Sequence, residues 1–224
     1  SPFRAFVNLA FSAGMRYDKP SGGEKMQIVF ENADFVVCVK PQGVLSAADA
    51  SGKPSMASLL APRTVWPVHR LDREAGGLMV FAKSAQCAAK LSATVQSGAF
   101  YKEYLAVCEG MPPREGTWED LLYHDRIKNK TYVVRRARAG VKKAKLSYRV
   151  LRVQDGCSVV AVRLFTGRTH QIRVQFASRG YPLCGDRKYG AATPGALKLC
   201  SWRLRFPLDG RDYAFELPEQ DFCL

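Results

Sequence analysis

The sequence predicts an α+β protein: a single domain with a central, mainly antiparallel mixed sheet, flanked by helices and loops. Two observations lead to this prediction. Most apolar segments have the length and composition of strands, and turn-forming residues connect many of them directly. Few segments with helical spacing lie between them, which disfavours a parallel sheet built from strand–helix–strand units. The 224 residues suffice for one sizeable core, and we find no internal repeat or interdomain linker.

The first elements are expected to be a hairpin, a short helix and a strand. Apolar runs at 28–30 and 35–39 are separated by the turn-like residues 31–34. A short helix is expected over 55–60, since Pro62 follows it. The compact apolar run at 78–82 predicts a strand.

A longer helix and three strands are expected next. Ser84 is a suitable N-cap for a helix that ends near Gly98. The segment 101–108 reads as a strand, and its period of two places Lys102, Tyr104 and Ala106 on one face. Two strands over 146–153 and 159–165 form a hairpin around an Asp-Gly turn.

The C-terminal part predicts one more helix and two strands. Thr169 is expected to cap a helix over 170–179 that ends at Gly180. Strands near 198–206 and 213–217 are separated by a Pro-Leu-Asp-Gly segment.

The charge indicates a polyanionic partner. The chain has 34 Lys and Arg against 20 Asp and Glu, a formal net charge of +14. Such an excess favours nucleic acid or an anionic membrane surface. The most basic stretch is 124–145, which also contains Tyr132. No apolar run approaches the length of a membrane span, so we expect no membrane-spanning segment, while the charge by itself fits either kind of polyanion.

Several classes of chemistry lose support. The seven cysteines are odd in number, widely spaced and free of CxxC pairs, and the three histidines lack ligand spacing with them. This pattern predicts reduced thiols in a cytoplasmic protein, and no metal site. Phosphate-loop, dinucleotide-binding and GxSxG motifs are also missing from the sequence, so we expect no cofactor.

A polar cluster at 68–78 contains the first candidate for catalysis. Asp72 lies between Arg70 and Arg73, just before a Gly-Gly pair and an apolar strand. Neighbouring guanidinium groups keep a carboxylate ionised, and an ionised carboxylate can act as a nucleophile. The alternative is a surface loop with salt bridges, which is the commoner outcome for such a composition.

Two further clusters have both a chemical and a structural interpretation. Residues 166–173 combine a glycine turn with basic residues at a helix start, which suits an anion, but an ordinary helix start with a structural His170 has the same pattern. In the segment 102–104, Lys102 is suited to a phosphate and Tyr104 to a base or a proton. The alternative is an aromatic residue that faces the core.

The clusters become specific in combination. HRLD at 69–72, KEY at 102–104 and GRTHQIR at 167–173 occur in this order, after KPQG at 40–43 and before a Gly-Asp and Tyr-Gly segment within 180–190. This set resembles the RluA-type pseudouridine synthase family over roughly residues 28–222. HRLD in place of GRLD favours the RluA branch over the RsuA branch.

The resemblance implies roles for particular residues. Asp72 would be the essential catalytic aspartate, Tyr104 would lie against the target uracil and take part in proton removal, and Arg173 would pair with Asp72. Arg70 would help to hold the extruded nucleotide. With Lys102 and Arg168 it forms the expected RNA-binding set. The family fold implies a central sheet with a long active-site cleft.

The same resemblance sets the expected domain boundaries. Residues 1–27 are expected to form an N-terminal lead-in, too short for an S4 RNA-binding domain, and 28–224 the catalytic domain. Ala75-Gly76-Gly77 occupies the place where the family usually has Thr-Ser-Gly, and Gln175 and Tyr181 replace histidines. These departures spare the residues assigned to chemistry and leave the exact RNA open.

The expected reaction is the isomerisation of uridine in a ribosomal or transfer RNA stem-loop by a monomeric cytoplasmic enzyme. Asp72 would either attack C1′ of the flipped nucleotide or remove a sugar proton to give a glycal, and the sequence leaves both routes open. One alternative is an inactive RNA-binding or RNA-folding module on the same scaffold. A second is a metal-independent nuclease that uses His69 or His170.

Overall fold

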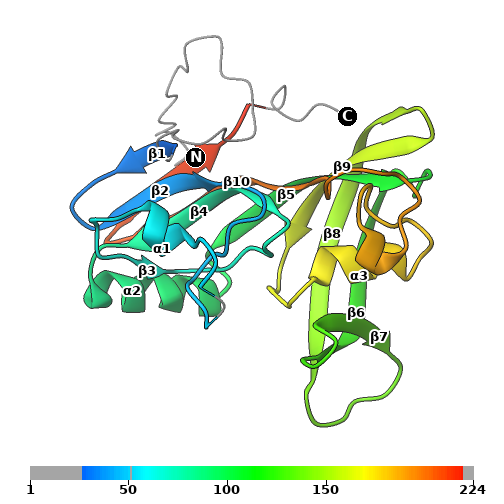
Figure 1. Cartoon of the computed structure of the whole chain (residues 1–224), viewed down its shortest axis with the longest axis horizontal. Coiled ribbons are helices and arrows are strands. Elements are labelled where there is room, and N and C mark those ends of the chain that lie inside the picture. Colours follow the sequence, from blue (N-terminus) through cyan, green and yellow to red (C-terminus); the bar gives the residue numbers. More distant parts are fainter. Residues whose placement is uncertain (1–26, 51, 219–224) are drawn as a thin grey trace. The chain divides into compact units, whose positions relative to one another are not determined.

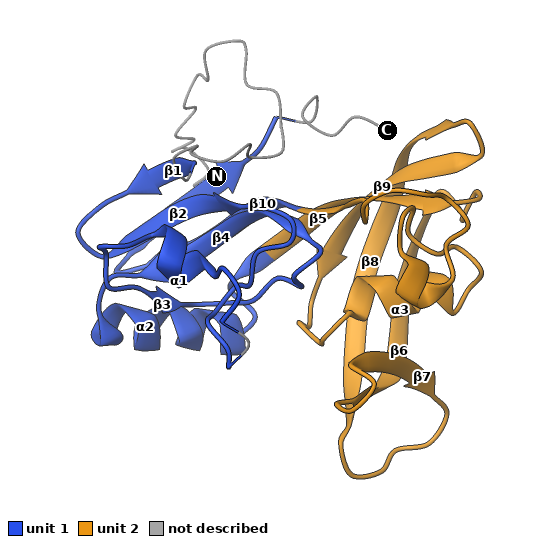
Figure 2. Ribbon diagram, in the orientation of Figure 1, with its two compact units in different colours: residues 1–101, 201–224 blue, residues 102–200 orange. Residues whose placement is uncertain are grey.

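The structure, a computed structural model, describes residues 27–50 and 52–218. These residues form two compact units, one with the residues up to 101 and from 201 onwards, the other with residues 102–200 (Figure 2). Each unit is built on antiparallel strands with few helices (Figure 1), which confirms the predicted fold class. All but the last residue of the lead-in expected over 1–27 lies outside the described residues.

The first unit contains a sheet in which β2 lies between β1 and β4, with β10 next to β4. Pairing is antiparallel between β1 and β2, β2 and β4, β3 and β4, and β10 and β11. The predicted N-terminal hairpin and the C-terminal strand pair are confirmed. The strands are β1 (Ile28–Glu31), β2 (Phe35–Lys40), β3 (Trp66–Pro67), β4 (Gly76–Ala82), β10 (Leu199–Leu208) and β11 (Arg211–Glu216).

Both predicted helices of this unit form. Helix α1 (Met56–Leu59) has Ser55 as its N-cap, and α2 (Ala85–Gln96) has Ser84. Helix α2 begins after Ser84 as predicted, and α1 begins one residue after its predicted start. The Ser84 hydroxyl accepts a hydrogen bond from the Cys87 N–H at 3.1 Å, which satisfies one of the free donors at the start of the helix. The core between the elements is apolar and closely packed, with Phe35, Leu78, Phe81 and Leu91 fully buried.

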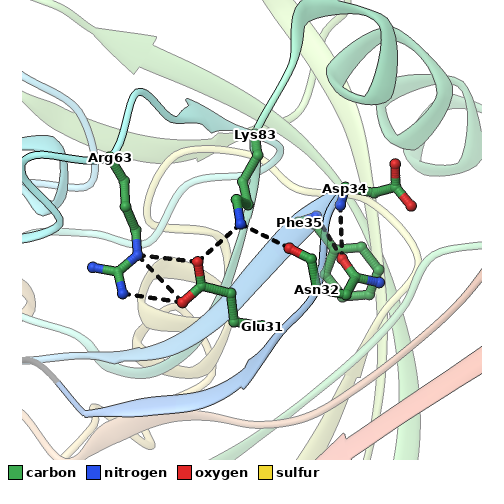
Figure 3. Close-up of polar contacts among 6 residues, drawn as sticks. All are labelled: Glu31, Asn32, Asp34, Phe35, Arg63 and Lys83. Carbon is green, nitrogen blue, oxygen red and sulfur yellow. Dashed lines mark hydrogen bonds and ion pairs between the residues drawn. The ribbon is translucent and has the colours of Figure 1, made fainter.

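The β1–β2 turn is held by a small polar cluster (Figure 3). The Asn32 carboxamide oxygen accepts from the backbone N–H of Asp34 and of Phe35 at 2.9 and 2.8 Å. The Glu31 carboxylate lies between Arg63 and Lys83, at 3.0 and 2.9 Å from their nitrogens. Hydrogen bonds from Arg63 and then Lys83 lower the pKa of Glu31 from 4.5 to about 2. The hairpin is thereby tied to the segments before β3 and after β4.

The second unit is a five-stranded antiparallel arrangement in the order β5-β9-β8-β6-β7. The predicted β8–β9 hairpin is confirmed, with Asp155 at a φ of 51° and Gly156 at 73° in its turn. Strand β8 begins earlier than expected. The strands are β5 (Tyr101–Glu109), β6 (Glu115–Asp125), β7 (Lys130–Val134), β8 (Val141–Gln154) and β9 (Cys157–Leu164).

Strands β6 and β7 were not predicted from the sequence. Both carry charged side chains and only partial burial, so their hydrophobic alternation is weak. Pairing with β8 along Glu115–Tyr123 supplies the order that the composition does not indicate. The basic stretch 124–145 therefore contains the end of β6, the turn to β7, strand β7, the loop after it and the start of β8.

Helix α3 (Gln171–Ala177) is shorter than predicted, and the capping prediction was wrong. Its N-cap is His170, in the left-handed conformation with a φ of 54°, and not Thr169. The Thr169 carbonyl instead accepts a hydrogen bond from the Thr131 hydroxyl at 2.8 Å. A one-turn 3₁₀ helix, η1 (Arg187–Tyr189), follows.

The described part of the chain contains free thiols, no group of metal-binding side chains and no helix that could span a membrane. Its six cysteines are free thiols, two of which, Cys157 and Cys184, have sulfur atoms 3.5 Å apart. Across the same residues, no three His, Cys, Asp or Glu side chains are grouped as a metal would require. The helices among residues 27–50 and 52–218 are all too short or too polar to cross a membrane.

Replacement of Glu31 by Gln should lower the free energy of unfolding at pH 6 by less than about 1 kcal/mol, because the ion pairs are partly exposed. The pKa of the folded state is depressed to about 2, so this stabilisation is present above pH 4.5 and is lost as the pH falls towards 2. Urea unfolding of both proteins at several pH values measures it. Glu216→Gln, which breaks a single exposed pair with Arg203, is the control. A difference that grows on acidification would contradict this account.

Candidate active site

Asp72 lies on a tightly anchored loop that leads into β4. The preceding residue, Leu71, is fixed by Ser46, whose hydroxyl accepts from the Leu71 N–H at 2.9 Å and lies 2.7 Å from the Leu71 carbonyl. The Asp72 carbonyl accepts from the Ala75 N–H at 3.1 Å, which closes a turn. Asp72 is half-buried and Arg70 is exposed. The backbone on both sides of the candidate carboxylate is thus fixed.

A buried lysine explains the KPQG segment. Lys40 is fully buried at the end of β2, and its ammonium group donates to the carbonyls of Pro41, Val44 and Arg73 at 2.9, 2.7 and 3.1 Å. The Arg73 carbonyl also accepts from the Gly43 N–H at 2.7 Å. Because a buried cation needs its donors satisfied, these bonds hold the residue after Asp72 to the end of β2.

The glycine pair after the loop has a structural reason. Gly77 pairs with Lys40 across β2 and β4, and its φ of 106° is one that other residues rarely adopt. Strand β4 therefore begins at Gly76, two residues before the predicted start. The Ala75-Gly76 portion that departs from the family pattern is buried at this join.

His69 has a structural contact. Its side chain is 9% exposed, and its Nε2 atom accepts a hydrogen bond from the Val80 N–H at 3.2 Å. The ring lies 5.4 Å from that of Phe100. The backbone hydrogen bond and the neighbouring ring give His69 a structural role.

Strand β5 supplies Lys102 and Tyr104 in the second unit. Both are buried, with 8% and 5% exposure, and they pair with Leu164 and Val162 of β9. The intervening Glu103 accepts from Arg149 at 3.1 Å. Since alternate residues of a strand share a face, Lys102 and Tyr104 lie on the same side of β5, as the sequence predicts.

Lys102 lies close to the GRTHQIR segment. A Cβ atom placed on Gly167 would be 3.5 Å from the Lys102 ammonium nitrogen. Burial, and then the charge of Arg168, lower the pKa of Lys102. The structure therefore brings together two of the three predicted RNA-binding residues, and their mutual repulsion favours an anion beside them.

The turn before α3 is held by Gln171. Its carboxamide oxygen accepts from the Thr166 hydroxyl at 2.8 Å and from the Arg168 N–H at 3.1 Å. The Arg168 Nε donates to the Lys143 carbonyl at 2.9 Å. Arg168 is thus presented from a rigid turn, and sequence reasoning assigned no role to the Gln171 that holds it.

Arg173 is held by a bidentate ion pair. Its Nε and Nη2 atoms donate to the two oxygens of Asp186 at 2.6 and 2.8 Å, and the two side chains are 3% and 1% exposed. The Arg173 guanidinium carbon lies 5.2 Å from the centre of the Tyr189 ring. Asp186 and Tyr189 belong to the Gly-Asp and Tyr-Gly segment of the sequence, to which the residue pattern assigns no task.

The predicted residues are distributed over both units. The first unit carries Asp72 and Arg70, and the second carries the other four, of which Lys102 and Arg168 lie together. Lys40, Gln171 and Asp186 are supporting residues that sequence reasoning missed. The signal for Lys40 is a charged residue at the end of an apolar run, which indicates burial with a partner but does not identify it.

Two solved structures share this fold. Human RNA Pseudouridylate Synthase Domain Containing 1 matches with a TM-score of 0.76 at 23% identity, covering 90% of this chain and 86% of that one. Human RNA Pseudouridylate Synthase Domain Containing 4 matches with a TM-score of 0.72 at 21% identity, covering 87% and 90%. The fold is therefore that of a pseudouridine synthase domain.

Residues 34–178 match the RNA pseudouridylate synthase family. The chain is 33% identical over 174 residues to an uncharacterised RNA pseudouridine synthase of Zymomonas mobilis, covering 74% of this chain and 78% of that protein. It is 33% identical over 175 residues to ribosomal large subunit pseudouridine synthase D of Haemophilus influenzae, covering 74% and 53%. The chain belongs to the RNA pseudouridylate synthase family, which confirms the RluA-type resemblance.

A third relative, the uncharacterised RNA pseudouridine synthase YhcT of Bacillus subtilis, is 32% identical over 202 residues, which cover 85% of this chain and 65% of that protein. The chain thus spans between about half and two thirds of the length of several curated relatives.

Replacement of Lys40 by Met should lower the free energy of unfolding by on the order of 3 kcal/mol, because buried carbonyl groups lose their donor. Urea unfolding measures this loss. Lys90→Met is the matched control, since Lys90 makes an exposed pair with Asp209 at 2.8 Å, and it should leave the urea midpoint almost unchanged. Equal effects of the two replacements would show that the buried contacts of Lys40 are not special.

Proposed function

We propose that this chain isomerises uridine to pseudouridine in RNA, with Asp72 as the catalytic group. The observation that carries the proposal is the ordered motif set inside a chain of the RNA pseudouridylate synthase family. The anchored Asp72 loop and the fixed Arg173 support it, since catalytic groups need rigid supports. The alternative of an inactive RNA-binding module retains the same fold but requires no activity from these residues.

The reaction breaks the N1–C1′ bond of uridine and joins C5 of the same uracil to C1′. Substrate and product are isomers, so the overall change consumes no oxidant, reductant or energy source. In the first route of the proposed mechanism, the Asp72 carboxylate attacks C1′ and displaces uracil at N1, and C5 of the turned uracil then displaces the carboxylate. In the second route, Asp72 removes a sugar proton as uracil leaves, which gives a glycal, and returns this proton when C5 bonds to C1′. In both routes N1 gains one proton and C5 loses one. Arg173 pairs with Asp72 and directs its carboxylate. Tyr104 guides the released uracil and accepts the C5 proton directly or through a water.

Positive side chains supply the affinity for RNA in this proposal. Extrusion of the target base requires a few kcal/mol of unstacking energy, which phosphate contacts can offset. Arg70 would hold the extruded nucleotide, while Lys102 and Arg168 would contact phosphate. The basic stretch 124–145 would extend the contact along β7 and the start of β8.

The substrate is proposed to be a stem-loop of ribosomal or transfer RNA, modified by a monomeric cytoplasmic enzyme. The name of the Haemophilus relative, ribosomal large subunit pseudouridine synthase D, favours ribosomal RNA. Pseudouridine mapping of total RNA with and without the gene identifies the position.

Asp72→Asn should abolish pseudouridine formation and leave the RNA dissociation constant within about threefold of the wild-type value. The amide keeps the shape of the side chain but is uncharged, so it cannot attack C1′ or remove a sugar proton. Single-turnover assays with total RNA, combined with filter binding, measure both quantities. Asp209→Asn, on an exposed ion pair of the same unit, is the control. Substantial turnover by Asp72→Asn would refute the catalytic assignment.

Tyr104→Phe should slow the single-turnover step by on the order of 100-fold, the range of one general acid–base contribution, while binding changes little. The phenyl ring preserves packing in β5, where the residue is 5% exposed. A rate equal to that of the wild type would remove the hydroxyl from the mechanism.

RNA affinity should fall steeply as salt rises, since each phosphate contact releases counterions. We expect Lys102→Ala and Arg168→Ala each to reduce the slope of log K against log salt by roughly 1. Gel electrophoresis in the same reactions tests the nuclease alternative, because isomerisation leaves RNA length unchanged. A flat salt response, or fragments that depend on His170, would contradict the proposed function.

A further inference from the structure

The Arg173 guanidinium is contacted by two residues of one short segment of chain. Asp186 and Tyr189, three residues apart at η1, contact its guanidinium from two directions: the carboxylate at 2.6 and 2.8 Å, and the ring at 5.2 Å from the guanidinium carbon. Both members of the ion pair are almost fully buried. A guanidinium held by a planar bidentate pair and an aromatic face has a defined place and a defined plane.

The ion pair also determines which N–H groups of Arg173 point away from Asp186. A guanidinium has five N–H donors in one plane, and Asp186 takes the edge formed by Nε and Nη2. A second carboxylate therefore has to approach through Nη1 or the outer N–H of Nη2. Asp186 thus fixes the direction in which Arg173 presents its remaining donors.

The backbone around Asp186 is fixed by a glycine and by hydrogen bonds. Gly185 has a φ of 77°, and a Cβ atom added to it would overlap the Ala196 carbonyl oxygen, so a side chain does not fit. The Asp186 N–H donates to the Leu183 carbonyl at 2.9 Å, and the Ala191 N–H donates to the Asp186 carbonyl at 3.1 Å. The carboxylate therefore sits on a fixed support.

Tyr189 connects the Arg173 contacts to the β6–β7 hairpin. Its hydroxyl oxygen accepts from the Thr131 N–H at 2.8 Å and lies 2.9 Å from Nδ1 of His170. The neighbouring Lys188 donates to the Asn129 carbonyl at 3.0 Å. Segment η1 is thus bonded to the β6–β7 hairpin on one side and contacts Arg173 on the other.

We propose that Asp186 and Tyr189 are positioning residues that set the place and orientation of Arg173 and thereby the rate of the chemical step. The proposal rests on the proposed function, in which Arg173 pairs with Asp72. Loss of the Asp186 carboxylate, or of the Tyr189 hydroxyl whose contacts with Thr131 and His170 hold the ring in place, leaves the guanidinium in the chain but removes its fixed orientation. The chemical step then slows while RNA affinity, which depends on other side chains, stays the same.

Asp186→Asn and Tyr189→Phe test this. The asparagine keeps the shape of the side chain but replaces one acceptor oxygen with an NH₂ group, and the phenylalanine keeps the ring but loses the hydroxyl. We expect Asp186→Asn to reduce the single-turnover rate by about 10- to 100-fold, the range found when residues that orient metal ligands are replaced. Tyr189→Phe should reduce it by about 3- to 10-fold, the range for one hydrogen bond. The dissociation constant of RNA should stay within about twofold.

Asp120→Asn is the matched control. Asp120 makes an ion pair with Arg179, just beyond the C-terminal end of α3, at 3.0 Å, with the two side chains 12% and 28% exposed. Its replacement removes an Asp–Arg pair next to the same helix without a contact to Arg173. The single-turnover rate of this variant should remain within about twofold of the wild-type rate.

A second readout is independent of activity. In NMR spectra of protein with labelled arginine, the Arg173 Nε–H should exchange slowly in the wild type and in Asp120→Asn, and rapidly in Asp186→Asn. Conversion of Arg173 to Lys identifies the signal. If Asp186→Asn does not fold, the rate of Tyr189→Phe decides the question.

The outcomes separate the two proposals. The positioning role is overturned if the wild type is active and Asp186→Asn and Tyr189→Phe have unchanged rates. It is also overturned if Asp120→Asn loses as much activity as they do. Both results leave the proposed function intact. A wild-type chain without activity on any RNA refutes the proposed function. The exchange of the Arg173 Nε–H then still decides whether Asp186 fixes this side chain.

Discussion

The second unit depends on the buried pair between Arg173 and Asp186. Two opposite charges with 3% and 1% exposure are stable only when each satisfies the other, and loss of one partner of such a pair typically costs about 3–5 kcal/mol. The pair therefore constrains α3, the loop after it and η1 at the same time. Helix α3 has only seven residues, too few for stability on its own, so tertiary contacts of this kind have to hold it.

The first unit also contains a buried cation, whose hydrogen bonds are accepted by neutral carbonyl groups. Lys40 has no exposed surface, and backbone carbonyls from three places in the chain accept its hydrogen bonds. Two of those carbonyls are adjacent to the end of β2, and the third follows Asp72. In both units a buried cation joins segments that are distant in sequence, and both cations lie beside motifs that carry the resemblance to the family.

Much of the fold could be predicted, because local chemistry defines it. Ser84 caps α2, and the Asp-Gly turn joins β8 and β9, since these residues satisfy helix donors or adopt the required conformations locally. Strands β6 and β7 could not be predicted, since their charged residues gain order only from pairing with β8. Thr169 was wrongly expected to cap α3, because Thr131 of β7 binds its carbonyl and His170 adopts the left-handed conformation at the cap.

The sequence alone determined the family and the candidate residues, because catalytic motifs are short, ordered and written in consecutive residues. The tertiary structure decided what supports them. Asp186 is thirteen positions from Arg173, and Lys40 is thirty-three from Arg73. No periodicity or local preference connects residues so far apart, and a buried charge finds its partner only when the chain has folded around it.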